Sequence, residues 1–373
     1  MTPLRLLIRF AVFVLVFVAL AEGWLRYVTP ANESPLYQQD PKTFLYRADP
    51  GAGNSGVFTE GRIPRRLAVW HVNDAGWLSP FEYLRRPPGR NLVAVFGDSY
   101  IEALGTPPAQ HLDVDLRADL GGRVPVYAFG MNGWYLEQYV VTERYVRATY
   151  DPSLMVLLVA QGDVSASLKA ESKYWFHIMP SGSGYREVPP GSLYTVSRQA
   201  RLAHESALIR YLRYNCHLEL PFMHGNDVQG APTDAAADSW SSPASAAYRR
   251  RLAKVLPAAR YMIGRLCAEN PGVPIVFAGR GSRYLPVDQV AATPLPPDME
   301  ALRRACVGHP QCHFLDLRMA FSLDWARHHK RFEAYDGSHF NAYANAVAAR
   351  AIAGYIENRA LLVSQTSMDG ATP

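Results

Sequence analysis

The sequence predicts an α/β protein, a three-layer α/β/α sandwich built on a five-stranded parallel sheet and preceded by one transmembrane helix. Five short runs rich in Val, Leu, Ile and Phe are each followed by a turn and a helical pattern. Continuous apolar runs of this kind are typical of parallel strands that are covered on both faces. The chain has 373 residues, of which 49% are hydrophobic, and this is enough to bury a large core.

The first 27 residues lead the chain to a membrane. Arg5 and Arg9 precede an unbroken apolar run, and residues 4–25 would form a helix of roughly 33 Å, enough to span a bilayer. The Ala-Leu-Ala at 19–21 also fits the small-residue pattern of signal peptidase sites. A retained signal anchor, which we favour, and a cleaved signal peptide therefore both stay open. Either one exports the remaining chain, to the periplasmic side of a bacterial inner membrane.

The remaining elements follow in order along the chain. Residues 28–90 are an extended, Pro/Gly-rich and aromatic lead-in segment, and the domain proper covers 91–363 with a tail at 364–373. The expected strands are 91–96, 125–129, 154–160, 274–278 and 313–317. Helical spacing predicts helices over 109–120, 134–148, 244–269 and 341–362.

A long insertion is expected at residues 165–243. It far exceeds an ordinary βα connection and is rich in Ser, Gly, Ala and aromatic residues. Connections of this length are usually functional lids or disordered segments.

Charge and cysteine patterns exclude several classes of protein. The net charge is +5, but the basic residues are scattered, so no nucleic-acid partner is expected. The four cysteines show no CxxC pair and no zinc-finger spacing to His, so no metal and no other cofactor is implied. In an exported protein Cys306 and Cys312 can form a disulfide that closes a short loop, but free thiols are equally compatible with the sequence. With Cys216 and Cys267 there are four cysteines, and the sequence does not decide which of them pair.

Two segments carry the candidate chemistry. Gly-Asp-Ser-Tyr at 97–100 places Ser99 at the carboxyl end of the first strand, where open parallel sheets bind ligands. Asp336 and His339 follow the last strand, and an Asp three residues before a His can orient one imidazole nitrogen while the other faces a serine. Alternatively, Gly-Asp-Ser is a sequence that is common in turns and at helix N-caps, Asp336 is an N-cap, and His339 is a surface residue.

Together these segments resemble the SGNH, or GDSL, hydrolase superfamily over residues 70–355. Gly-Asp-Ser-Tyr is similar to its first sequence block and Asp-Gly-Ser-His at 336–339 to its last. The resemblance implies that Ser99 is the nucleophile, His339 the general base and Asp336 its orienting partner. The segment before the first strand and the N-terminal anchor resemble bacterial membrane-anchored members.

The resemblance also implies an oxyanion hole made by the Ser99 N–H, a glycine in a second block and an Asn in a third. Residues 128–134 match the second block, with Gly133 as the donor. The third block departs from the pattern, because Gly162 occupies the Asn position in Gln161-Gly162-Asp163. Losing such a donor costs about 100- to 1,000-fold in turnover, unless Gln161, water or another N–H replaces it. Asp163 is interpreted as a structural residue of this loop.

These residues favour an exported, membrane-anchored serine esterase that removes a small acyl group, an O-acetyl ester above all, from a carbohydrate or cell-envelope polysaccharide through an acyl-serine intermediate. One alternative is a polysaccharide O-acetyltransferase that uses the same triad. The other is a catalytically silent component of a polysaccharide assembly machine, motivated by the missing Asn. The expected partners are an acylated carbohydrate or small ester and, under the transferase alternative, polysaccharide-modification machinery in the inner membrane.

Overall fold

The computed structural model describes residues 2–86, 91–169, 173–218, 243 and 245–362. Its centre is a five-stranded sheet in the order β11-β10-β7-β5-β6, with every neighbouring pair parallel. The strands are β5 (Val93–Gly97), β6 (Val126–Gly130), β7 (Leu154–Val159), β10 (Ile275–Gly279) and β11 (Cys312–Asp316). All five expected strands are confirmed, with ends displaced by two residues at most.

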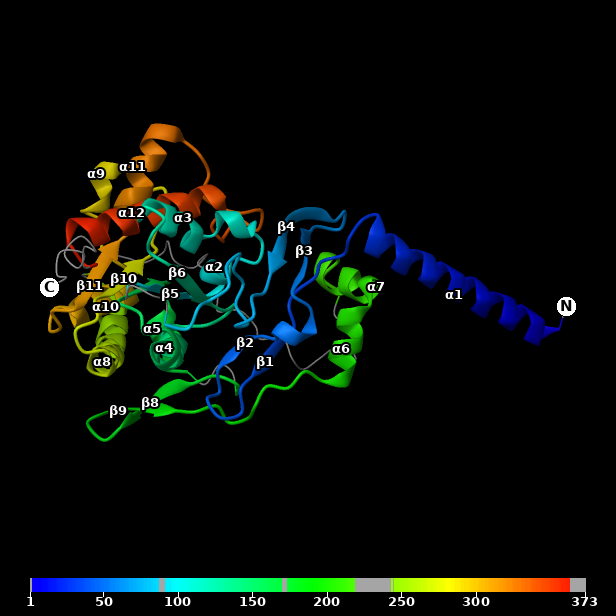
Figure 1. Ribbon diagram of the computed structural model, residues 1–373, viewed down its shortest axis with the longest axis horizontal. Helices are drawn as coiled ribbons and strands as arrows, with labels where there is room; N and C mark the ends of the chain where they lie inside the picture. The colour runs from blue at the N-terminus through cyan, green and yellow to red at the C-terminus, as the bar shows by residue number, and fades with distance from the viewer. Residues whose placement is uncertain (1, 87–90, 170–172, 219–242, 244, 363–373) are drawn as a thin grey trace, which may run out of the picture.

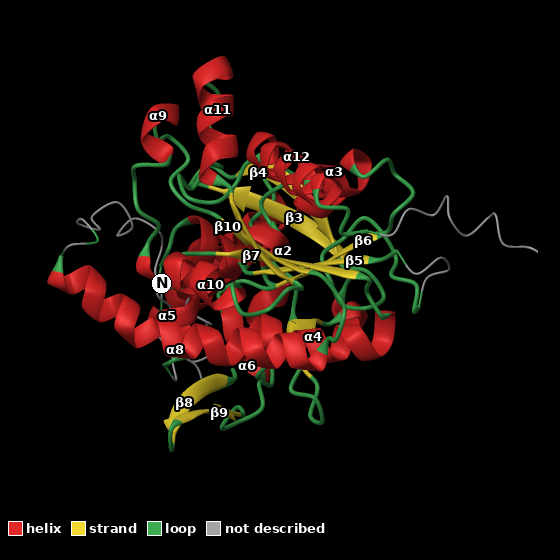
Figure 2. Cartoon of the chain, turned by 90° about the vertical axis from the view of Figure 1, so that its left-hand side faces the viewer, coloured by secondary structure: helices red, strands yellow, loops and turns green. Residues whose placement is uncertain are grey.

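Helices cover both faces of the sheet, which confirms the three-layer sandwich (Figure 2). One face carries α4 (Leu136–Tyr150), α8 (Ala246–Glu269) and α10 (Pro297–Cys306). The other carries α3 (Leu112–Asp119), α11 (Arg318–His328) and α12 (Ala342–Asn358). The short helical segments are α2 (Ser99–Glu102), α5 (Asp163–Ser167), α9 (Val287–Val290), η1 (Pro50–Ala52) and η2 (Pro108–Gln110).

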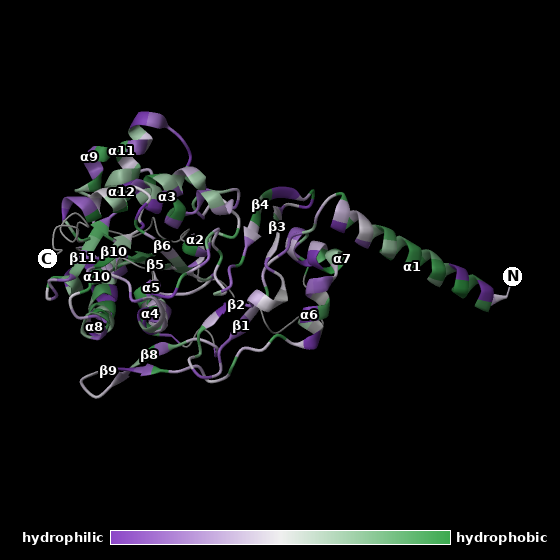
Figure 3. Ribbon diagram, in the orientation of Figure 1, coloured by the Kyte–Doolittle hydropathy of each residue, from purple (hydrophilic) through white to green (hydrophobic). Residues whose placement is uncertain are grey.

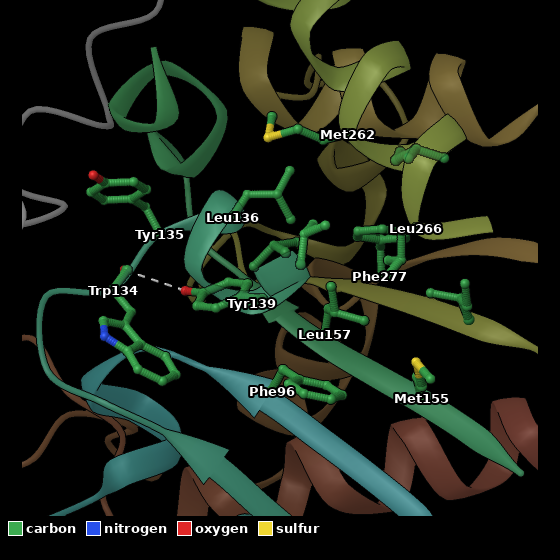
Figure 4. Close-up of a cluster of buried hydrophobic side chains, with 14 of the residues drawn as sticks. Phe96, Trp134, Tyr135, Leu136, Tyr139, Met155, Leu157, Met262, Leu266 and Phe277 are labelled. Carbon is green, nitrogen blue, oxygen red and sulfur yellow. Dashed lines mark hydrogen bonds between the residues drawn. The ribbon is translucent and has the colours of Figure 1, made fainter. Parts of the chain in front are cut away.

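The sheet is buried because its strands are apolar along their whole length. Every residue of β5, β6, β7 and β10 is buried, whereas the edge strand β11 is mostly half-buried. Figure 4 shows the packing on one face, where Tyr139 of α4 and Leu266 of α8 pack over Phe96 and Leu157 of the sheet. This core fixes the carboxyl edge of the strands, from which the candidate site is built.

The lead-in and the long connection form small antiparallel sheets of their own. The lead-in contains the pairs β1 (Tyr37–Gln39) with β2 (Tyr46–Ala48) and β3 (Ser55–Glu60) with β4 (Arg65–His71). The described part of 165–243 contains the pair β8 (His177–Ser181) and β9 (Gly184–Val188), then α6 (Arg198–Glu205), α7 (Ala207–Arg210) and the π-helical turn η3 (Tyr211–Asn215). Residues 219–242 and the tail at 364–373 lie outside the described residues.

These two segments pack against each other. The Gln39 side chain donates to the Tyr174 carbonyl (2.8 Å) and accepts from the Tyr194 N–H (2.8 Å). The Asn32 N–H donates to the side-chain oxygen of Asn215 (2.9 Å). Residues far apart in the sequence therefore build one wall beside the sheet (Figure 1).

The N-terminal helix α1 (Pro3–Tyr27) projects from this wall as a single rod (Figure 1). Its apolar window is fully exposed, and the helix is long and apolar enough to cross a membrane. Figure 3 shows that hydrophobic residues dominate most of its length.

The cysteines resolve into one pair and two thiols. Cys306 and Cys312 form a disulfide that joins the end of α10 to the start of β11. Cys216 is half-buried and free, and Cys267 is buried and free. Of the pairings that the sequence left open, the structure therefore contains the one that closes the short loop, Cys306 with Cys312.

Candidate active site

Ser99 and the two expected oxyanion glycines lie at the ends of three neighbouring strands. Ser99 follows β5, Gly133 follows β6 and Gly162 follows β7, and β5 lies between the other two strands. Because the strands are parallel, their carboxyl ends meet at the same edge of the sheet. The first, second and third sequence blocks are therefore adjacent in space.

Glycines let the Ser99 helix sit close to the sheet. Asp98 caps α2, because its side chain accepts from the Tyr100 N–H at 3.0 Å. A Cβ at Gly97 would lie 2.4 Å from Ile101 Cγ1, and a Cβ at Gly130 would lie 2.5 Å from the Glu102 nitrogen. Neither position can hold a larger side chain without moving α2 and, with it, Ser99.

The structure brings Ser99, His339 and Asp336 together. His339 Nε2 lies 2.7 Å from Ser99 Oγ, and His339 Nδ1 faces Asp336 Oδ2 in a hydrogen bond. Asp336 Oδ1 accepts from the backbone N–H groups of Ser338 (2.9 Å) and His339 (3.0 Å). Burial raises the pKa of Asp336, but the hydrogen bonds from His339 and from the two N–H groups outweigh it and hold the pKa well below its usual range. Asp336 is therefore ionised and aligned toward the imidazole.

The alternative interpretation of Asp336 as a helix cap is wrong. The last helix begins at Ala342, and its N-cap is Asn341, whose side chain accepts from the Ala344 N–H at 2.9 Å. Asp336 and His339 lie in the loop before that cap, where the Asp336 side chain faces the imidazole of His339 and the imidazole faces Ser99.

A set of aromatic and basic residues that the sequence analysis missed holds this loop. The Tyr100 hydroxyl (2.7 Å) and Arg283 Nη1 (2.8 Å) both donate to the Ser338 carbonyl. Arg280 pairs with Asp98 at 2.9 Å and lies 3.3 Å from the centroid of the Tyr100 ring. Arg280 directly follows β10, so its place at the carboxyl end of a buried strand is the signal that would have identified it.

Glu102 is a second residue that the sequence analysis missed. It is buried one helical turn after Ser99 and accepts from the Tyr37 hydroxyl (2.7 Å) and from the Asn132 N–H (3.0 Å). Burial raises the pKa of Glu102 to about 7. Because Asn132 precedes Gly133, this carboxyl group ties the second-block loop to the helix that carries Ser99.

Both glycines of the expected oxyanion hole have backbones that favour glycine. Gly133 is buried with φ +76, and Gly162, the N-cap of α5, has φ +105. A Cβ at Gly162 would meet nothing within 4 Å, so there is open space for a side chain at this position. Asp163 Oδ2 accepts from the Ala160 N–H at 2.9 Å and from the Tyr139 hydroxyl at 3.3 Å, which gives Asp163 the structural role expected of it.

A cavity of about 290 Å³ lies between the lead-in and residues 194–214. Glu102 and Asn132 form part of its wall, so it adjoins the edge that carries Ser99. The rest of the wall is mainly aromatic and aliphatic and includes Tyr37, Tyr46, Phe58, Tyr194, Val196 and Ile209. Its volume is near the lower end of small-molecule sites, which is ample for more than an acetyl group. Among the described residues no group of three or more His, Cys, Asp or Glu is placed to hold a metal ion.

Comparison with known proteins does not give an activity for this chain, so its chemistry has to follow from the residues of the site. No family model and no curated protein matches the chain. Among solved structures, LAE5, an alpha/beta hydrolase from the metagenome of Lake Arreo, is 13% identical with a TM-score of 0.36, covering 74% of this chain and 97% of its own. The acetyl xylan esterase Est2A from Butyrivibrio proteoclasticus is 11% identical (TM-score 0.35; 76% and 67% covered). The salicylyl-acyltransferase SsfX3 is 12% identical (TM-score 0.36; 74% and 58% covered). Similarity this low does not assign an activity.

Proposed function

We propose that this protein is a serine ester hydrolase of the SGNH type with Ser99, His339 and Asp336 as its catalytic triad. One observation carries the proposal: His339 Nε2 lies 2.7 Å from Ser99 Oγ while Nδ1 is bonded to an ionised Asp336. This arrangement lets the imidazole accept the serine proton and lets the carboxylate stabilise the resulting cation.

The reaction proceeds in two displacements. Ser99 Oγ attacks the ester carbonyl and passes its proton to His339 Nε2, which gives that proton to the leaving alcohol as the acyl-serine forms. Water then attacks the acyl-serine, again losing a proton to His339, and the acid leaves as the proton returns to Ser99. The proposed oxyanion donors are the backbone N–H groups of Ser99 and Gly133, with Gly162 at the third position.

The proposed substrate is a small acyl ester, in particular an O-acetyl group on a carbohydrate or cell-envelope polysaccharide. The cavity beside Glu102 and Asn132 supports a substrate larger than the acyl group alone, because its aromatic rings offer faces on which a sugar can stack. We further propose that α1 is a retained anchor and that the catalytic domain lies on the extracytoplasmic side of a bacterial inner membrane.

The cavity also supports a second candidate, transfer of the acyl group to a sugar hydroxyl. A sugar bound beside Asn132 would compete with water for the acyl-serine, and the product would be an acylated sugar. Incubation with an acetyl ester and an oligosaccharide acceptor, followed by mass spectrometry, separates the two. Free acetate alone indicates the hydrolase, and an acetylated acceptor indicates the transferase.

The triad is tested with a fluorophosphonate, which reacts with activated serines, on the full chain in detergent. We expect one adduct, on Ser99, and loss of both the adduct and ester turnover in Ser99→Ala. Ser338→Ala is the matched control, because Ser338 Oγ is 3.3 Å from His339 Nδ1 but on the wrong nitrogen for activation. A folded wild-type protein without an adduct would contradict the triad and favour the silent component. An adduct that survives Ser99→Ala would also contradict the triad, because it would place the reactive serine elsewhere.

A further inference from the structure

The last turn of α1 is built into the folded domain. The Glu22 carboxylate accepts from the N–H groups of Ala207 (2.8 Å) and Leu208 (2.8 Å) and from the Ser206 hydroxyl (2.9 Å), so it caps α7. Leu25 is buried in a small cluster with Ala207. These contacts fix the direction of α1 relative to the domain, and the elements around its base therefore face the membrane in a defined way.

Helix α6 lies at this base. Arg26 of α1 donates to the backbone carbonyl of Glu205, the last residue of α6. Arg198, Arg201 and Leu202 are exposed at i, i+3 and i+4, which places them on one face of the helix, and Leu202 is 58% exposed. The opposite side of the helix lines the cavity through Ala200 and His204. The outer face of α6 is therefore basic, with one exposed leucine beside the two arginines.

The turn between β3 and β4 lies on the same side of the molecule (Figure 1). The Tyr211 hydroxyl of η3 donates to the Arg62 carbonyl (2.7 Å), which joins this turn to the helices that hold α1. Arg62, Arg65 and Arg66 are exposed there, and Ile63 between them is 89% exposed. An aliphatic side chain this exposed among arginines has no role in the core.

We infer that these residues form a membrane-docking collar for anionic phospholipid headgroups, made of Arg62, Ile63, Arg65, Arg66, Arg198, Arg201 and Leu202. Within the described part of the chain, none of the five arginines is paired with a carboxylate. Clustered arginines beside a membrane-spanning helix attract anionic headgroups, and exposed aliphatic side chains add insertion at the boundary. The inference rests on α1 being the proposed anchor, and it does not depend on ester turnover.

Docking would hold the candidate active site close to the lipid surface. Glu60 ends β3, directly before the collar turn, and a Cβ at the next residue, Gly61, would lie 3.8 Å from the hydroxyl of Tyr335, which precedes Asp336. The strand that carries the collar therefore also reaches the triad loop. A substrate linked to a membrane lipid or emerging from a membrane protein would meet Ser99 without long diffusion.

The test uses nitroxide labels on the full chain reconstituted in vesicles. Ile63→Cys and Leu202→Cys are labelled in a Cys216→Ser background. Lys254→Cys is the matched control, since Lys254 is exposed on α8, far from α1 (Figure 1). In phosphatidylcholine vesicles that contain phosphatidylglycerol as the anionic lipid, we expect both collar labels to gain contact with oxygen and lose contact with a water-soluble nickel complex. The control label keeps its aqueous accessibility.

Two changes should release the collar. Salt at about 1 M shortens the Debye length to about 3 Å and removes the lipid contact. Reversing Arg62, Arg65 and Arg66 to Glu weakens headgroup association by at least about fivefold per residue and frees the label at 63. Collar labels as accessible as the control in anionic vesicles would overturn the collar alone. Failure of the unmodified chain to float with vesicles would overturn both the anchor and the collar, and neither outcome bears on the triad.

Discussion

Restoring an amide at the third oxyanion position is the sharpest test of the site. The backbone of Gly162 follows β7 with φ +105, and open space lies where a Cβ would stand. Gly162→Asn therefore introduces a side-chain donor without a clash, at the position where the resemblance implies one. We expect the variant to turn over an acetyl ester faster than the wild-type protein.

The substitution has two separate effects. The positive φ strains any residue other than glycine and lowers the free energy of unfolding by about 1–3 kcal/mol. That strain is present in both the ground state and the transition state, so it leaves kcat unchanged. An added oxyanion donor lowers the activation free energy by up to about 3–4 kcal/mol, and a water or Gln161 already in place would reduce the gain. An increase of about tenfold or more in kcat is the expected result.

Gly162→Ala is the matched control, because it carries the same backbone strain and no donor. Turnover of an acetyl ester is measured for the wild-type protein and both variants, and stability is followed by urea unfolding in detergent. We expect both variants to lose similar stability and only Gly162→Asn to gain kcat. Equal kcat for the Asn and Ala variants would refute a third oxyanion position at residue 162.

Three further predictions address the rest of the site and the fold. Asp336→Asn keeps the acceptor for the two loop N–H groups but not the imidazole alignment, so turnover of an acetyl ester should fall by about 10⁴-fold with the fold unchanged by circular dichroism. The pKa of Glu102 is about 7 in the folded protein, above the unfolded value of 4.5, so Glu102 stabilises the fold below pH 4.5 and loses that contribution as the pH rises through 7. Relative to Glu102→Gln, the free energy of unfolding measured in urea should fall by about 3 kcal/mol across this range. Cys306→Ser opens the loop to Cys312 and should lower the free energy of unfolding by about 2 kcal/mol, and no change would indicate a reduced pair.

The sheet could be predicted from the sequence because its signals are local. Each strand is a continuous apolar run that ends in a turn, and a strand covered on both faces leaves no other pattern. The place of Ser99 at this edge could also be predicted, since Ser99 follows the end of β5 and parallel topology brings strand ends to one edge. The segment 336–339 is separated from the end of β11 by α11, so the order of the strands alone does not place it beside Ser99. The structure shows their proximity, with His339 Nε2 at 2.7 Å from Ser99 Oγ.

The residues around the triad could not be predicted in the same way, because their partners are far away in the sequence. Gln39 bonds to residues 174 and 194, and Tyr211 bonds to the Arg62 carbonyl. Short strands paired only to each other carry no continuous apolar pattern, so the lead-in appeared to be an extended segment. Arg280 has a signal in the sequence, because it directly follows a buried strand, whereas Glu102 is a charged residue in a short helix and only the packing shows that it faces inward.

The lead-in has a more direct relation to the site than its position before the first strand suggests. The Tyr37 hydroxyl donates to Glu102, Glu102 accepts from the Asn132 N–H, and Asn132 precedes Gly133. A single buried carboxyl group thus connects the lead-in, the Ser99 helix and the second-block loop. Removing residues 28–90 would leave that group without one of its two donors and would open the cavity wall that Tyr37 and Phe58 form. The position of Gly133 relative to Ser99 therefore depends on a segment that supplies no catalytic residue.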